Sequence, residues 1–367
     1  MSLVQYPELG FYALPGHVSQ PAELAGQVRQ GEALGLGSVW IAERLNSKNV
    51  PVLAGIAAGV SSRLGIASGL LANLPLRHPL VTASFGATMA LVTGGRFALG
   101  IGRGVDHLAD STGTPRLNMR LMKDFVDILR ALWRGESVDY EGPLGTLKGL
   151  TLGVQPDAPP PVIMAAMGDK TCKWAGSFCD GVVLNALWSP EAVARSVELI
   201  RQGAREAGRD PASVRIWAIL VTACEVDEDY MLDVIVRRLN TYVLVPPVFA
   251  AMCVGNGWDQ NVAAGMRDLL VEADAGKKRG LMGGDHTSCD RDHLRRCLDA
   301  YPQRWLDEGA AVGSAARCAS KILERFDAGV DGVLLHGSTP EYLASLVTEW
   351  GKVRPARRFA ARSANPG

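Results

Sequence analysis

Residues 63–104, RLGIASGLLANLPLRHPLVTASFGATMALVTGGRFALGIGRG, predict two parallel strands joined by a helix. Residues 64–71 are apolar without polar alternation, which is typical of a strand buried on both faces. Pro79 occupies a favoured first position of the helix between the strands, and Gly94-Gly95 ends that helix. Residues 97–101 form the next apolar strand. A parallel pair with a helical crossover is therefore expected.

Apolar and amphipathic stretches alternate along most of the remaining chain. Eight buried strands with intervening helices fit a closed (β/α)8 TIM barrel better than an open sheet, which would need a switch in strand order. The expected strands lie at residues 8–14, 38–42, 64–71, 97–101, 161–165, 181–184, 214–222 and 330–335. The expected helices lie at residues 21–34, 51–60, 79–92, 119–133, 169–178, 190–207, 314–327 and 340–351.

The spacing of the last two strands predicts a large insertion. Roughly 100 residues separate them, far more than one crossover helix needs. We expect a single barrel domain at residues 1–356, with a helical insertion at about 223–313 that contributes a lid. Residues 135–160 are expected to be a Gly- and Pro-rich connection, and residues 357–367 a flexible C-terminal tail.

Composition restricts the partners of the chain. The 367 residues carry a formal net charge of zero, so no global attraction to nucleic acid or to an anionic membrane is expected. No apolar stretch is long enough to predict a membrane span. The odd number of cysteines, seven, favours reduced thiols in the cytoplasm. His286, Cys289 and His293 match no standard four-ligand zinc spacing, so no metal is expected.

Four stretches together resemble the luciferase-like oxidoreductases, the barrel superfamily that includes bacterial luciferase, flavin-dependent monooxygenases and coenzyme F420-dependent dehydrogenases. The most specific is residues 63–104, because it combines RHP, an alanine-rich helix, GGRF and LGIGRG. The F420-dependent branch is the more similar one. The other three stretches are LGLGSVWIAER (34–44), PVIMAAMGDKTCKWAGSFCDGVV (161–183) and VGSAARCASKILERFDAGVDGVLL (312–335).

This resemblance implies an oxidoreductase that transfers a hydride between F420 and a small organic substrate. Two alternatives stay open: an FMN-dependent luciferase-like monooxygenase, and a catalytically idle flavin-binding barrel. Relatives of this barrel are commonly dimeric, and the apolar helix at residues 79–92 would gain from burial between two copies. We therefore expect a cytoplasmic homodimer.

Three strand ends supply the expected cofactor site. In the family, Gly69 and Leu70 correspond to a bulge, often with a non-prolyl cis peptide, that supports the central ring. Glycines at a strand end let backbone approach a flat ring, although a nicotinamide fingerprint or a tight turn would also explain them. A strand end that runs into a helix offers free N–H groups to a phosphate. The candidates at these last two ends are Gly102, Arg103, Gly104, Ala166, Met167, Gly168, Asp169 and Lys170; Asp169 could instead simply cap the helix.

Titratable groups at the strand ends are candidates for proton transfer. Glu43-Arg44 stands where many F420-dependent sugar-phosphate dehydrogenases carry an Asp-His pair, and this departure argues against a glucose 6-phosphate type of reaction. Glu43 remains a candidate acid or base. Asp106 and His107 follow the fourth strand and are the other candidates.

Overall fold

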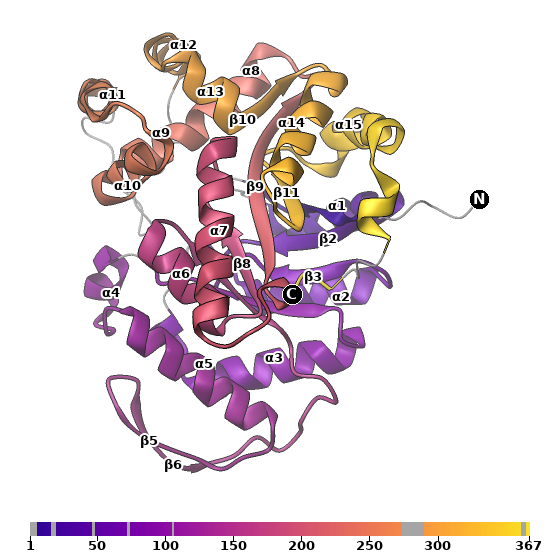
Figure 1. Cartoon of the computed structure of the whole chain (residues 1–367), viewed down its shortest axis with the longest axis vertical. Coiled ribbons are helices and arrows are strands. Elements are labelled where there is room, and N and C mark those ends of the chain that lie inside the picture. Colours follow the sequence, from indigo (N-terminus) through magenta and orange to yellow (C-terminus); the bar gives the residue numbers. More distant parts are fainter. Residues whose placement is uncertain are drawn as a thin grey trace.

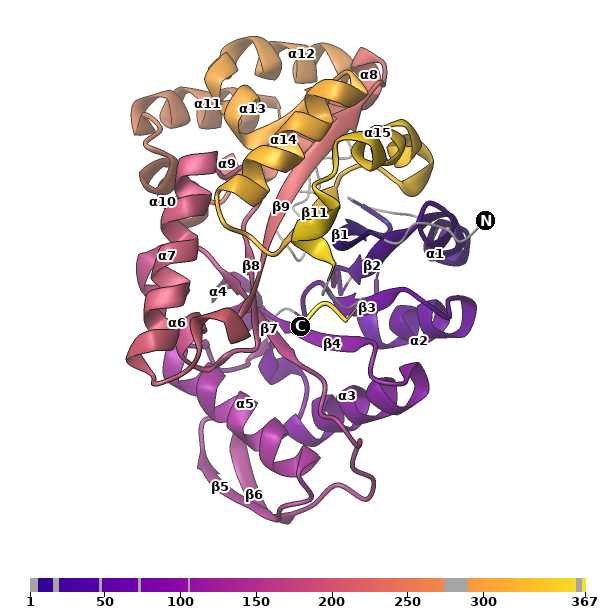
Figure 2. The same ribbon diagram turned by 45° about the vertical axis from the view of Figure 1, so that its right-hand side comes forward.

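Eight parallel strands close into a barrel, as the sequence predicts (Figures 1 and 2). The structure, a computed structural model, describes residues 6–15, 20–45, 48–71, 74–104, 106–273, 290–360 and 365–367. The strand order is β1-β2-β3-β4-β7-β8-β9-β11, and β11 pairs with β1 to complete the circle. These strands are β1 (Tyr6–Tyr12), β2 (Leu36–Ile41), β3 (Gly65–Ser68), β4 (Phe97–Ile101), β7 (Val162–Ala166), β8 (Gly181–Leu184), β9 (Arg215–Cys224) and β11 (Gly332–His336).

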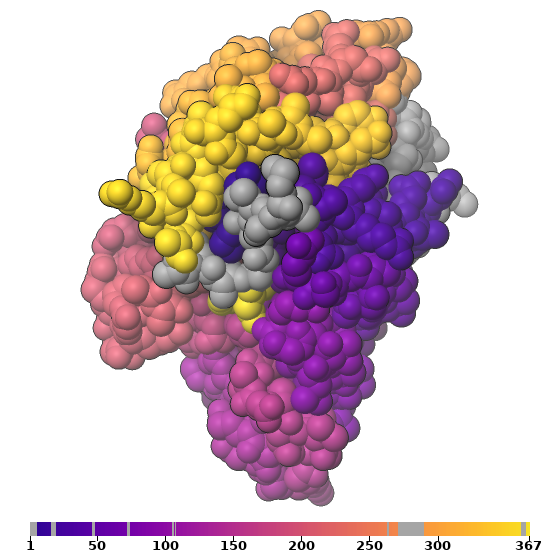
Figure 3. Space-filling model, turned by 90° about the vertical axis from the view of Figure 1, so that its right-hand side faces the viewer, coloured from indigo at the N-terminus to yellow at the C-terminus, as the bar shows by residue number. Residues whose placement is uncertain are grey.

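Helices cover the outside of the barrel, each in the crossover between two neighbouring strands (Figure 2). The C-terminal segments, yellow in Figure 3, lie against the N-terminal segments in indigo, as the pairing of β11 with β1 requires. The outer helices are α1 (Leu24–Ala33), α2 (Val50–Val60), α3 (Pro79–Thr93), α5 (Met119–Trp133), α6 (Asp169–Phe178), α7 (Pro190–Glu206), α14 (Ala315–Asp327) and α15 (Pro340–Val353).

Two tryptophans fill the barrel interior. The Trp40 and Trp217 rings meet edge to face, with centroids 5.2 Å apart. Their bulk requires small neighbours: a Cβ added at Gly332 would lie 2.4 Å from the Trp217 ring. Ala67 and Ala98 occupy the same inner cluster. The barrel is therefore a packed core, and any ligand space lies beyond it, at one mouth.

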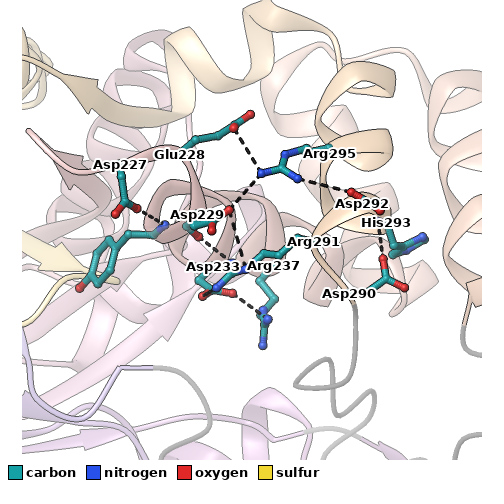
Figure 4. A network of polar contacts seen from close by, with 11 residues as sticks. Asp227, Glu228, Asp229, Asp233, Arg237, Asp290, Arg291, Asp292, His293 and Arg295 are labelled. Carbon is teal, nitrogen blue, oxygen red and sulfur yellow. Dashed lines mark hydrogen bonds and ion pairs between the residues drawn. The ribbon is translucent and has the colours of Figure 1, made fainter.

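The insertion before the last strand is helical, as expected. It contains α8 (Glu228–Met231), a π-helical turn (Leu232–Val236), α9 (Arg237–Val243), α10 (Pro246–Asn256), α11 (Gln260–Ala273), α12 (Arg291–Ala300) and α13 (Gln303–Gly309). In Figure 4, Arg291 and Arg295 of α12 reach back to the start of the insertion. Arg291 lies 2.7 Å from Asp233 and Arg295 lies 3.2 Å from Asp229.

No single described helix is long and apolar enough to cross a membrane. Only a pair, Glu228–Val243 with Pro246–Asn256, reaches that length and composition jointly, across a bend of 108°.

Two parts of the fold differ from the prediction. The expected connection at residues 135–160 contains an antiparallel hairpin, β5 (Val138–Gly142) and β6 (Gly145–Leu150). The insertion ends in a further strand, β10 (Ala310–Gly313), which pairs with the outer half of β9. Both are short segments whose apolar residues are too few to predict a strand.

The expected flexible tail, residues 357–367, makes specific contacts where the structure describes it. Phe359 is buried and its ring lies 4.7 Å from that of Phe326. The Trp217 indole N–H donates to the Pro366 carbonyl at 2.7 Å. The end of the chain thus lies beneath the barrel interior, at the mouth opposite the strands' carboxyl ends.

Candidate active site at the carboxyl ends of the strands

A cavity of about 510 Å³ lies at the carboxyl ends of the barrel strands. Three expected groups surround it, as predicted: Gly69 with Leu70, Gly102–104, and Ala166 with Met167. Glu43 also lines it. Gly168, Asp169, Lys170 and Asp106 are not among the lining residues, although Thr171, in the first turn of α6, is.

The bulge expected after β3 is present, and the Gly69–Leu70 peptide bond is cis. On one side Gly69 N–H donates to Ile41 O at 2.8 Å, and Glu43 N–H donates to Leu70 O at 3.2 Å. On the other side Leu71 N–H donates to Gly100 O at 2.9 Å. Hydrogen bonds to both neighbouring strands therefore hold Leu70 at the cavity wall.

Gly168 caps α6, in place of Asp169 as considered above. Its φ of +84° is a conformation that glycine adopts readily, and no side chain caps the helix there. The first-turn N–H groups of an α-helix have no intrahelical partner. Asp169 and Lys170 are exposed, and the Asp169 carboxylate pairs with Arg195. The backbone at this helix start, more than these two side chains, can meet an anion.

The three candidate acids and bases differ in their surroundings. The Glu43 side chain is fully buried, and both of its carboxylate oxygens accept hydrogen bonds from Arg77. Asp106, at the start of α4 (Asp106–Thr112), is half exposed and lies 3.6 Å from Arg103. The His107 side chain lies outside the described part of the structure. Of the three, only Glu43 lines the cavity among the described side chains.

Sequence reasoning missed a set of polar residues on the opposite wall. Tyr12 follows β1, and His336 ends β11; their rings meet edge to face at 4.7 Å. Arg238 reaches the cavity from α9, where it donates to the Tyr242 hydroxyl at 2.7 Å. The wall is completed by Arg44, Lys48 and Asn185. Single arginines, lysines and tyrosines far apart in the sequence carry no motif, so no sequence signal would have found this set.

Burial and mutual repulsion shift the ionisation of this wall. Burial, followed by repulsion from Arg44 and Arg238, lowers the pKa of Lys48 to about 7. Burial, with repulsion from Arg238, lowers the pKa of Arg44 to about 10. Burial and the same three cations hold the pKa of His336 well below its usual value, so its imidazole is neutral at pH 7. Burial raises the pKa of Tyr12, which keeps its phenol protonated.

A metal site finds no support among the described residues, where no three potential ligands are grouped. His286 and Cys289 lie outside those residues. His293, the third residue considered above, is buried in α12 and its ring nitrogen lies 3.4 Å from the Cys297 sulfur.

Comparisons with known proteins add to this geometry. The model of the luciferase-like monooxygenase family matches residues 8–332. The 5,10-methylenetetrahydromethanopterin reductase of Methanolobus tindarius is 25% identical over 314 residues, which cover 85% of this chain and 89% of the reductase. The F420-dependent glucose-6-phosphate dehydrogenase of Kineococcus radiotolerans is 27% identical over 207 residues, which cover 53% of this chain and 61% of the dehydrogenase.

Solved structures share the fold. The coenzyme F420-dependent tetrahydromethanopterin reductase from Methanopyrus kandleri matches with a TM-score of 0.77 at 21% identity, covering 93% of this chain and 97% of the reductase. An F420-dependent secondary alcohol dehydrogenase matches with a TM-score of 0.70 at 19% identity, covering 95% of this chain and 98% of the dehydrogenase.

Proposed function

Because this chain belongs to the luciferase-like monooxygenase family, we propose that it is a coenzyme F420-dependent oxidoreductase. It transfers a hydride between the deazaflavin and a small organic substrate. The observation that carries this proposal is the glycine-lined cavity at the strands' carboxyl ends, where catalytic residues of such barrels gather. The relatives named for F420 or methanopterin reduction support the choice of cofactor.

The residues of the cavity fit such a cofactor. A Cβ at Gly102 would come within 3.5 Å of the Leu70 side chain, so the backbone of residues 102–104 leaves room that larger residues would fill. The start of α6 beyond Ala166 and Met167 offers N–H groups for a phosphate. Leu70, Met122 and Met164 supply an apolar surface for a ring. When bound, the cofactor supplies the hydride chemistry.

The chain's own residues hold the ring, exclude water and manage a proton. Glu43, Asp106 and His107 remain our candidates for proton transfer. The cavity wall adds Tyr12, a protonated phenol, and the neutral His336. A cytoplasmic location also remains a prediction.

Binding of F420 and FMN, measured side by side on the purified protein, tests the proposed cofactor. We expect saturable binding of F420 and at least tenfold weaker binding of FMN, followed by fluorescence of either ligand. Tight FMN binding without F420 binding would favour the flavin monooxygenase instead. Binding of either cofactor without any substrate that changes its absorbance would favour the idle barrel.

We also propose that the protein is a homodimer joined through α2 and α3. These neighbouring helices expose Val52 and Ile56 on α2, and Val81, Leu91 and Val92 on α3 (Figure 2). Exposed apolar side chains gathered on adjacent helices are typical of an interaction surface. Two copies related by a two-fold axis would cover this face isologously.

Light scattering of the eluted protein at micromolar concentration checks this assembly. We expect a dimer for the wild type and a monomer for the double variant Val81→Asp/Val92→Asp. Val254→Asp is the matched control, since Val254 is as exposed as Val92 (62% against 64%) but lies on α10. A monomeric wild type would remove the proposal.

A further inference from the structure

The cavity has two chemically different walls. The barrel order places the ends of β4 and β7, with their glycines and the start of α6, opposite the ends of β11, β1 and β2. On this second side Arg44, Lys48 and Arg238 all line the cavity. Three cations thus share one wall of a closed space.

Hydrogen bonds fix the first two cations in place. Arg44 and Lys48 form a small antiparallel bridge, in which Arg44 N–H donates to Lys48 O at 3.2 Å and Lys48 N–H donates back to Arg44 O at 2.5 Å. The Lys48 ammonium donates to the Leu14 carbonyl at 2.7 Å. The short loop after β2 therefore presents both side chains together.

The insertion brings the third cation to the same wall. Arg238 follows the π-helical turn, and Val234 of that turn occupies the space beside Gly337, where an added Cβ would lie 2.3 Å from it. Gly337 directly follows His336 at the end of β11. Arg238 donates to Tyr242, whose hydroxyl donates to Asn185 at 3.2 Å. Insertion and barrel thus build one site from residues about 190 positions apart in the sequence.

The charge of this wall is unbalanced. Among the described residues, no carboxylate forms an ion pair with Arg44 or Arg238, and the carboxylate nearest to Arg44 in sequence, Glu43, is held by Arg77. His336 is 7% exposed, and its Nδ1 has no hydrogen-bond partner within the described structure. The lowered pKa values of Lys48 and Arg44 have the same cause. Buried cations are costly unless a partner of opposite charge compensates them.

We propose that Arg44, Lys48 and Arg238 form an anion-binding subsite that receives a carboxylate of the substrate, so that the protein acts on organic acids. This inference rests on the proposed function only in placing the cofactor on the opposite wall. A carboxylate can accept from both arginines at once, because guanidinium groups offer paired donors. His336 Nδ1 lies at the same wall as a further polar contact.

Binding of benzoate and of its neutral counterpart benzamide to the purified full chain, by calorimetry at pH 6.5, tests the subsite. We expect benzoate to bind at least tenfold more tightly than benzamide. Arg44→Met and Arg238→Met should each weaken benzoate binding at least tenfold and change F420 binding less than threefold. Arg296→Met, which removes the same charge from the exposed face of α12, should change neither.

The pH dependence adds a second readout. Lys48 faces Arg44 in its own loop, Arg238 from α9, Tyr12 from β1 and His336 from β11. A bound anion favours protonated Lys48, so benzoate affinity should be constant below about pH 7 and fall above it. Lys48→Met should remove this fall.

Several outcomes would overturn the subsite. If benzoate binds no better than benzamide, or if neither binds, the wall is not an anion site. If the arginine variants lose F420 and keep benzoate, the cations serve an acidic group of the cofactor. If F420 does not bind but benzoate discrimination and its loss in the variants are observed, the proposed cofactor is wrong while the anion site stands.

Discussion

The Arg77→Met variant is expected to lose about 3–5 kcal/mol of the free energy of unfolding, because it leaves a buried carboxylate without its counter-charge. The Glu43 side chain is completely buried, and Arg77 is 13% exposed and donates to both Glu43 oxygens. Chemical denaturation at pH 7 measures the loss.

Two controls separate this effect from loss of packing. The double variant Arg77→Met/Glu43→Gln removes both charges and should recover a large part of the stability. Arg63→Met breaks a more exposed pair, Arg63 with Glu32 at 3.0 Å, and should cost less than about 1 kcal/mol. An Arg77→Met variant no less stable than Arg63→Met would mean that water or another group compensates Glu43, which would then be accessible for proton transfer.

The Gly168→Val variant is expected to weaken F420 binding by about 1–3 kcal/mol, roughly 5- to 150-fold, the cost of leaving buried polar groups unpaired. A branched side chain at the cap of α6 would stand between the first-turn N–H groups and a phosphate. Equilibrium titration of the folded variant with F420 gives the affinity.

Gly208→Val is the matched control. Both glycines have positive φ, +84° and +71°, and at neither would an added Cβ meet another atom within 4 Å. The two variants therefore carry similar backbone strain, but Gly208 follows α7 away from the cavity. Equal affinities for F420 in both variants would remove the start of α6 from the cofactor site.

The barrel was predictable because its strands are buried on both faces. The segments 97–101 and 181–184 are continuous apolar runs, and β4 and β8 have these bounds. Helix α5 was equally clear, since its apolar residues recur on one face between Asn118, which caps it, and Arg134. The β5–β6 hairpin was missed because only Val138 and Leu147 are buried in it, so its pattern is that of a solvated loop.

The two walls of the cavity differed in how far sequence could reach. Glycines at strand ends and a strand running into a helix are local patterns, and they placed Gly69, Gly102 and Ala166 around one cavity. The cationic wall depends on the insertion folding back so that Arg238 meets Arg44. That approach is a property of tertiary packing, and no local pattern encodes it.

The double use of β9 has a mechanical consequence. Its first residues pair with β8, its middle with β11, and Val221–Cys224 with β10 at the end of the insertion. A hinged swing of the whole insertion would break this four-residue ladder. The spacing between the cations and the glycine-lined wall is therefore set by a continuous strand, and an acid whose carboxylate lies too near its reacting carbon, or too far from it, cannot span both. Chain length of the substrate, more than its bulk, is what this protein should discriminate.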